Sequence, residues 1–141
     1  MASKNAQLDH LRNVPLFSSC STKDLQKIAR ASDELDVPAG HVICDQGQMG
    51  REAFVLMSGS ATVKRNGKKV TTLGPGSVVG ELSLLDRGPR TATVVTDTET
   101  TLLVIDQRHF AGVIDEVPAL AHKILATLAG RIRDFDRSMY G

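Results

Sequence analysis

One short segment of the sequence combines glycine, a carboxylate and an arginine at spacings that suit the binding of an anion. Gly80 and Glu81 stand together, and Arg90 heads a later run of β-branched residues. We expect a single helical turn over residues 81–85, because the start of a helix presents free backbone N–H groups and a positive dipole end. A guanidinium adds a forked pair of charged hydrogen bonds to phosphate oxygens, each worth about 1.5–3 kcal/mol. Residues 76–94 are therefore predicted to bind an anionic group such as a phosphate.

Other kinds of chemistry have little support in the sequence. The four histidines do not cluster, and His41 and Cys44 lie three residues apart on a predicted strand, hence on opposite faces. We therefore expect no metal site and no metal cofactor. Motifs of serine hydrolases, zinc proteases, P-loops and dinucleotide-binding folds are missing from the sequence, so we do not expect an enzyme. Cys20 and Cys44 are too few for a disulfide framework and are interpreted as reduced thiols.

The segment lies within a region whose pattern is typical of strands. Residues 36–106 consist of short runs rich in β-branched residues, separated at regular intervals by glycine and proline. Asn66-Gly67 predicts a two-residue hairpin, since both residues tolerate the positive φ angles of a type I′ turn. The fold class is therefore predicted to be mainly β with flanking helices, with the evenly spaced short strands forming a sandwich, a barrel or a jelly roll.

Helical patterns precede and follow this region. Residues 1–35 are expected to hold N-terminal helices, one of them starting in a capping box at Ser21 with Asp24 as its third helical residue. Residues 107–141 are expected to form C-terminal helices that act as a lid. Asp106 is predicted to cap the first of these, and Pro118 suits the first turn of the second.

The last predicted helix carries an apolar stripe with heptad-like spacing. Its residues are Ala121, Leu125, Leu128, Ile132, Phe135 and Met139. Such a stripe packs on its own domain or pairs with a second copy in a homodimer. The sequence leaves both interpretations open.

Length and charge set further limits. A chain of 141 residues fits one domain, which we predict to span residues 1–141. The net charge is +1 with scattered lysines and arginines, which predicts no direct binding of nucleic acid or of a membrane surface. The N-terminus is polar, unlike a secretory signal, and the apolar runs are far shorter than a membrane helix needs. A soluble, cytoplasmic protein is expected.

Residues 80–94 resemble a motif of a known family, the cyclic-nucleotide-binding domains. The family's phosphate-binding cassette reads close to G-E-[LI]-[ASG]-L, a variable turn, then [PR]-R-[TSA]-A-x-V. Residues 80–94 read G-E-L-S-L-L-D-R-G-P-R-T-A-T-V. Residues 11–17 (L-R-N-V-P-L-F) resemble the family's entry helix, and residues 54–61 and 73–81 resemble its central strands and the run into the cassette.

The resemblance implies a jelly-roll-like β-roll, and it implies a role for individual residues. Arg90 would pair with the cyclic phosphate and Glu81 would accept a hydrogen bond from the ribose 2′-hydroxyl. Backbone or hydroxyl contacts would come from Gly80, Leu82 and Ser83, and the phosphate and base would be lined by Thr91 and Ala92. On the last helix, relatives place different side chains at the base, which leaves three candidates here: Phe135, Arg131 and Arg133.

These roles imply a non-catalytic sensor of cAMP or cGMP whose C-terminal helix moves when the ligand binds. Thr91 does not decide between the two nucleotides, and cAMP is favoured because it is the more frequent ligand in the family. Two alternatives remain. One is a nucleotide-free interaction or dimerisation module. The other is the sensor piece of a catabolite-activator-type transcription regulator.

Overall fold

The N-terminal helices begin where the sequence supplies caps. The structure, a computed structural model, describes residues 4–80 and 88–140. It opens with α1 (Lys4–Arg12), a short 3-10 turn η1 (Pro15–Phe17) and α2 (Thr22–Arg30). At α2 the Ser21 hydroxyl accepts from the Asp24 backbone N–H at 3.1 Å, and the Asp24 carboxylate accepts from the Ser21 N–H at 3.1 Å. This reciprocal pair confirms the predicted capping box.

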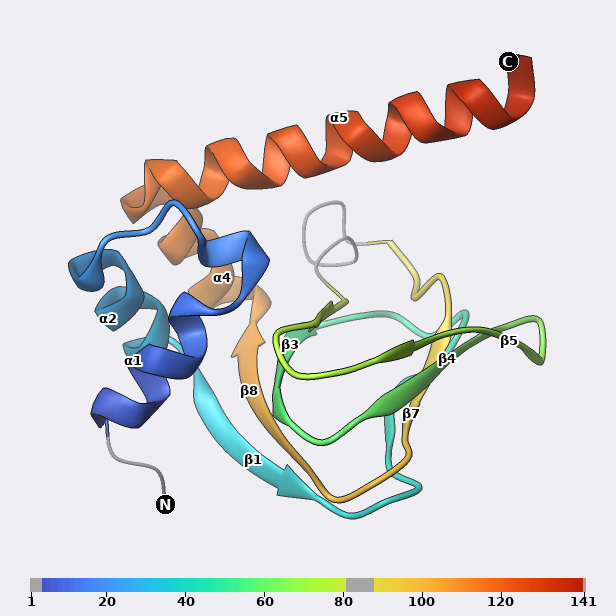
Figure 1. The fold of residues 1–141 in the computed structure, drawn as a ribbon, viewed down its shortest axis with the longest axis horizontal. Helices are drawn as coiled ribbons and strands as arrows, with labels where there is room; N and C mark the ends of the chain where they lie inside the picture. Colours follow the sequence, from blue (N-terminus) through green and yellow to red (C-terminus); the bar gives the residue numbers. More distant parts are fainter. Residues whose placement is uncertain (1–3, 81–87, 141) are drawn as a thin grey trace.

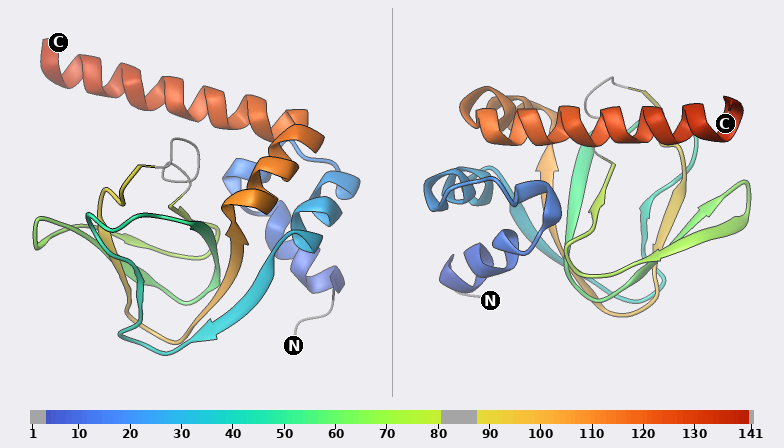
Figure 2. Two further views of the ribbon diagram at one scale, coloured as in Figure 1. Left: turned by 180° about the vertical axis from the view of Figure 1, so that it is seen from behind. Right: turned by 45° about the horizontal axis from the view of Figure 1, so that its top comes forward.

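Within the described ranges eight short strands follow and form two antiparallel sheets (Figure 1). The strands are β1 (Asp33–Val37), β2 (Val42–Cys44), β3 (Glu52–Ser58), β4 (Ala61–Arg65), β5 (Lys68–Leu73), β6 (Val78–Val79), β7 (Thr93–Thr96) and β8 (Thr100–Asp106). One sheet has the order β1-β8-β3-β6 and the other β2-β7-β4-β5. The two sheets curl around each other into a roll, and the helices gather on one side of it (Figure 2). The predicted β-roll with flanking helices is confirmed.

The β-roll starts earlier than expected. Residues 33–35, which the sequence pattern left among the N-terminal helices, belong to β1, which pairs with β8 from Asp33↔Val104 to Val37↔Thr100. Four of the five residues of β1 are exposed, so the strand shows no alternation of apolar and polar residues. Its conformation comes from backbone pairing with β8, a long-range contact that local sequence does not reveal.

The hairpin between β4 and β5 forms where it was predicted. β4 ends at Arg65 and β5 begins at Lys68. The two turn residues both have positive φ, 54° at Asn66 and 79° at Gly67. This is the backbone geometry that a two-residue type I′ turn needs.

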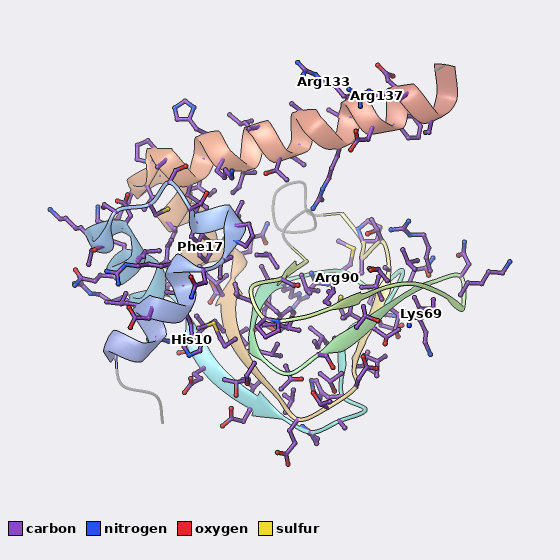
Figure 3. The ribbon with its side chains drawn as sticks, in the orientation of Figure 1. His10, Phe17, Lys69, Arg90, Arg133 and Arg137 are labelled. Carbon is purple, nitrogen blue, oxygen red and sulfur yellow. The ribbon has the colours of Figure 1, made fainter. Side chains whose placement is uncertain are left out.

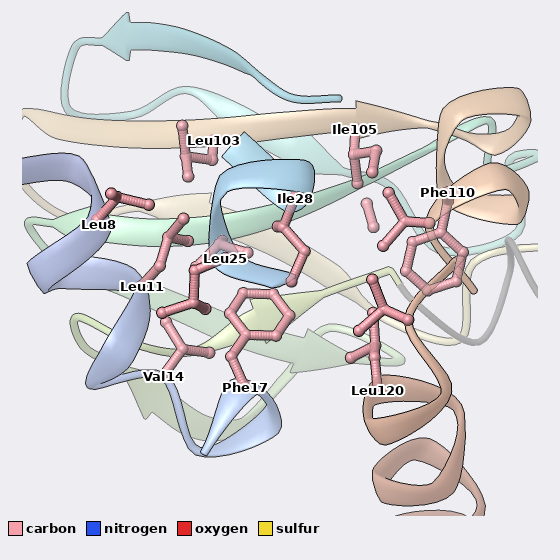
Figure 4. Packing of buried hydrophobic residues seen from close by; sticks show 14 of the residues in the cluster. Leu8, Leu11, Val14, Phe17, Leu25, Ile28, Leu103, Ile105, Phe110 and Leu120 are labelled. Atoms are coloured by element: carbon pink, nitrogen blue, oxygen red, sulfur yellow. The ribbon is translucent and has the colours of Figure 1, made fainter. Parts of the chain in front are cut away.

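The central strand β3 is buried on both faces, one inside the roll and one under the helices. Along β3, Phe54 and Leu56 point into the roll, while Ala53, Val55 and Met57 point to the helical layer. The helices contribute buried side chains to this second layer, shown close up in Figure 4: Leu8, Leu11, Val14, Phe17, Leu25, Ile28, Phe110 and Leu120. The helices are thus fixed to the sheet by apolar burial, which is the dominant favourable term in folding.

Two C-terminal helices complete the chain. The Asp106 carboxylate caps α4 (Gln107–Glu116) by accepting from the His109 backbone N–H at 2.8 Å, as predicted. α5 (Pro118–Tyr140) docks on the helical layer through Leu120 and Ile124, which are 1% and 5% exposed. It then continues over the open end of the roll (Figure 1). No helix within the described ranges is long and apolar enough to cross a bilayer.

Candidate functional site

Arg90 is buried in the roll, with 8% of its surface exposed, although it carries a permanent charge. Its Nη1 donates to the Gly80 carbonyl oxygen at 3.2 Å and its Nη2 donates to the Glu52 carbonyl oxygen at 2.7 Å. The guanidinium carbon also lies 5.8 Å from the centroid of the Phe54 ring, close enough for a cation–π contact. Among described residues, its hydrogen-bond partners are therefore neutral groups.

Gly80 makes the close approach of Arg90 possible. Its φ is +85°, a left-handed conformation that side chains rarely adopt. A Cβ at this position would overlap the Arg90 Nη1 and would lie 3.1 Å from its Cζ. Glycine is therefore needed here twice, for the backbone angle and for the space that the guanidinium occupies.

The loop between β2 and β3 holds the Arg90 backbone. The Arg90 N–H donates to the Gln48 carbonyl at 2.8 Å, and the Gly47 N–H donates to the Arg90 carbonyl at 2.9 Å. An isolated bridge between Met49 and Pro89 continues this pairing. These backbone contacts fix the segment that precedes β7, and so fix the position from which the Arg90 side chain enters the cleft.

Arg90 lies at the floor of a cleft of about 580 Å³, a volume in the range of small-molecule sites. Apolar side chains of the roll, among them Val63, Leu73 and Val94, make up much of the wall. The described lining residues include three arginines, Arg65 from β4, Arg90, and Arg131 from α5, and no carboxylate. The cleft combines an apolar wall with positive charge, which suits a ligand that has both an aromatic and an anionic part.

The structure brings several of the predicted site residues together and separates others. The cleft lining includes Gly80, Arg90, Thr91, Ala92 and Arg131. Phe135 is 62% exposed and is not among the lining residues. Figure 3 shows Arg133 on the side of α5 turned away from the roll, at a distance from Arg90. Glu81, Leu82, Ser83 and the helical turn expected at 81–85 lie outside the described residues.

Arg65 is a cleft residue that sequence reasoning missed. Its Nε donates to the Thr91 carbonyl at 3.2 Å, which ties β4 to the segment after Arg90. In the sequence it is one of several basic residues around the Asn66-Gly67 turn, and such residues usually face solvent. The inward direction of Arg65 follows from the pairing of β4 with its neighbours, which the sequence alone does not give.

Other parts of the surface fit an anionic ligand less well. A second cleft of about 530 Å³ is lined by Asp36 and Glu99, whose negative charge disfavours an anion. Within the part of the chain that the structure describes, no three histidine, cysteine or acidic residues lie close enough to hold a metal ion. The cleft at Arg90 is therefore the candidate site.

Two titratable groups with shifted pKa values, Cys20 and Asp106, lie away from this cleft. Burial, and then the nearby Asp24 charge, raise the pKa of the Cys20 thiol, so this cysteine stays protonated at neutral pH. The hydrogen bond from the His109 backbone lowers the pKa of Asp106, and the His109 side chain adds to the effect. Both shifts have structural causes, and neither indicates catalysis.

Fold and cleft together define a small β-roll binding module with a cationic pocket under a terminal helix. The chain belongs to the cyclic nucleotide-binding domain family, whose model matches residues 34–117. That range extends from β1 to Val117, just before α5, and contains Gly80, Arg90 and the hairpin.

Individual relatives come from more than one kind of regulator. The chain is 30% identical over 131 residues to a cyclic AMP receptor protein of Thermus thermophilus, covering 89% of this chain and 61% of that protein. It is 37% identical over 101 residues to a cAMP-dependent protein kinase regulatory subunit of Schizosaccharomyces pombe, covering 71% of this chain and 24% of the relative. A crystal structure of the Thermus thermophilus catabolite activator protein superposes with a TM-score of 0.82 at 31% identity, covering 89% of this chain and 61% of that one. The chain thus spans about six-tenths or less of these relatives' length.

Proposed function

We propose that the chain is a non-catalytic sensor that binds a cyclic nucleotide, preferably cAMP, in the cleft at Arg90. The observation that carries the proposal is the burial of the Arg90 guanidinium in the cleft, where its hydrogen-bond partners among the described residues are the neutral carbonyls of Gly80 and Glu52. A charge removed from water is costly unless an opposite charge or strong hydrogen bonds compensate for it. A cyclic phosphate monoanion would supply that charge, and the apolar wall of the cleft would hold the purine.

The remaining contacts follow the family pattern. Glu81 would accept from the ribose 2′-hydroxyl, and Gly80, Leu82 and Ser83 would offer backbone or hydroxyl contacts to the sugar and phosphate. Thr91 and Ala92 line the described part of the cleft, which agrees with a place beside the phosphate and base. No cofactor other than this ligand is proposed.

The terminal helix would carry the response to the ligand. The face of α5 that buries Leu120 and Ile124 on its own domain continues along the helix to Arg131, which lines the cleft. A nucleotide that touches both Arg90 and Arg131 would favour one position of α5 over others. Such a ligand shifts the equilibrium between positions by its difference in affinity for them.

Replacing Arg131 by alanine is expected to lower cAMP affinity about 5- to 30-fold, because a guanidinium stacked on a desolvated aromatic ring contributes about 1–2 kcal/mol. Isothermal titration of the purified variant measures the change. Arg133→Ala is the matched control, since Arg133 lies on the opposite side of the same helix (Figure 3). An equal loss in both variants, or none in Arg131→Ala, would contradict the role given to Arg131.

A homodimer through α5 is part of the proposal. Leu125, Ile132 and Phe135 are 64%, 65% and 62% exposed, and they lie on one stripe of the helix. Apolar side chains at this spacing fit a coiled-coil contact with a second copy. The stripe therefore supports pairing of α5 with α5, beyond the part that packs on its own domain.

The proposal is tested by titrating the purified chain with cAMP and with cGMP while light scattering follows its mass. We expect saturable binding of one nucleotide per chain, tighter for cAMP, with a mass of two chains. Tighter binding of cGMP would reverse the assigned preference. No binding and no thermal shift at millimolar concentration of either nucleotide would favour the alternative, an interaction module with an empty cleft. The relatives are longer than the matched region, so this proposal concerns the binding domain alone.

A further inference from the structure

The hairpin at the end of β4 and β5 concentrates positive charge. Lys64, Arg65, Lys68 and Lys69 surround the Asn66-Gly67 turn, and all four side chains are exposed. The strand register places Lys64 opposite Lys69 and Arg65 opposite Lys68. Like charges directly opposite each other on neighbouring strands destabilise a sheet. The hairpin thus holds two successive repulsive pairs.

Nothing in the described structure neutralises this charge. The ion pairs among the described residues are Arg12–Asp9 and His109–Asp106, both on helical segments away from the hairpin. The turn is instead held by a neutral side chain. The Gln46 amide donates to the Asn66 Oδ1 at 2.9 Å and accepts from the Asn66 N–H at 2.8 Å. The fold therefore keeps four positive charges together although their mutual repulsion opposes it.

The charged hairpin is also the rim of the cleft. β4 and β5 contribute Val63, Arg65, Val70 and Thr71 to the cleft lining. In Figures 1 and 2 the hairpin projects from the roll on the side where the C-terminal end of α5 also lies. An anion that enters the cleft past these strands therefore moves through the positive field of the hairpin.

We propose that Lys64, Lys68 and Lys69 steer the anionic nucleotide into the cleft and so raise its association rate. The inference rests on the proposed function. Charges of one sign around a cleft raise the association rate of oppositely charged ligands, by tenfold or more in strong cases. Because these lysines are not among the cleft-lining residues, they act on the encounter and contribute little to the bound complex. Removing these charges should therefore lower kon at low salt, should have no effect on kon at high salt, and should leave koff unchanged.

The experiment compares two triple variants by stopped-flow fluorescence with a fluorescent cAMP derivative. The test variant is Lys64→Gln with Lys68→Gln and Lys69→Gln. The control, Lys23→Gln with Lys27→Gln and Arg30→Gln, removes three positive charges from α2, which lies across the molecule from the hairpin (Figure 1). At about 10 mM ionic strength the screening length is about 30 Å, so steering is fully expressed there.

We expect the test variant to lose about fivefold in kon at low salt, with koff within about twofold of the unchanged chain. The loss should vanish near 1 M salt, where the screening length falls to about 3 Å. The control should keep a kon close to that of the unchanged chain. The test variant should also melt at the same temperature or higher, because two repulsive cross-strand pairs have been removed.

Other outcomes overturn the inference in distinct ways. An unchanged kon at low salt would show that the hairpin charge does not steer the nucleotide. A higher koff would make the lysines ligand contacts, and an equal loss in the control would assign the effect to net charge. If the unchanged chain does not bind the derivative at all, the proposed function fails, and the inference fails with it.

Discussion

Arg90→Ala is expected to lower cAMP affinity by at least about 100-fold. The variant removes a forked pair of charged hydrogen bonds, each worth about 1.5–3 kcal/mol, and every 1.4 kcal/mol is a factor of ten. Arg90→Glu should abolish binding completely, because it replaces the attractive charge by a repulsive one. Isothermal titration with cAMP measures both changes.

Two further variants separate the geometry of Arg90 from its charge alone. Arg90→Lys keeps the charge but loses the fork, so we expect an affinity between those of the unchanged chain and the alanine variant. Arg87→Ala removes a second arginine of the same segment, one that falls outside the family motif, and should bind normally. Full-strength binding by a folded Arg90→Ala, checked by its thermal melt, would show that the phosphate binds elsewhere.

Much of the fold follows from local signals in the sequence. The capping box at Ser21 and the cap at Asp106 involve residues three apart in the chain, so their geometry is encoded locally. The turn at Asn66-Gly67 is encoded in the same way, by two residues that accept positive φ. Short β-branched strands between such signals leave few architectures other than a β-roll or sandwich.

The rest depends on contacts between distant segments. β1 is a strand because it pairs with β8, about 65 residues later in the chain, and its exposed residues give no periodic pattern. The direction of Arg65 into the cleft depends likewise on the pairing of β4 with β7 and β5. Neither feature is visible in a window of a few residues.

The terminal helix combines both cases: its helical conformation is predicted by local sequence, whereas its docking depends on distant contacts. Its apolar spacing identified α5 as a helix with a stripe, but the stripe could not say where docking ends. In the structure α5 docks through Leu120 and Ile124, which lie beside the predicted stripe, and Leu128 is partly buried against the same cluster. Leu125, a member of the predicted stripe, is 64% exposed.

The sequence did not decide which of Phe135, Arg131 and Arg133 would contact the base. In the structure, Arg131 is the one of these three that lines the cleft. Which of these side chains faces the cleft depends on the orientation of α5 about its own axis, and this orientation is set by packing against the rest of the domain.

Gly80→Ala is expected to reduce both the stability of the fold and the affinity for cAMP. An alanine at φ +85° costs about 1–2 kcal/mol in backbone strain. Its Cβ would also overlap the Arg90 Nη1, with the Glu52 carbonyl 3.1 Å away on the other side. Arg90 must therefore move, and we expect a loss of affinity of about tenfold or more, since losing one charged hydrogen bond costs about 1.5–3 kcal/mol and every 1.4 kcal/mol is a factor of ten.

Gly40 provides the control that separates strain from displacement. Its φ of +81° is nearly the same, but nothing lies within 4 Å of the position of an added Cβ. Gly40→Ala should thus lose a similar free energy of unfolding in urea and keep its affinity in isothermal titration. If both variants lost affinity equally, general destabilisation would be the cause. A difference in affinity at equal stability would locate the effect at the contact between Gly80 and Arg90, and so tie the backbone conformation at Gly80 to recognition of the anion.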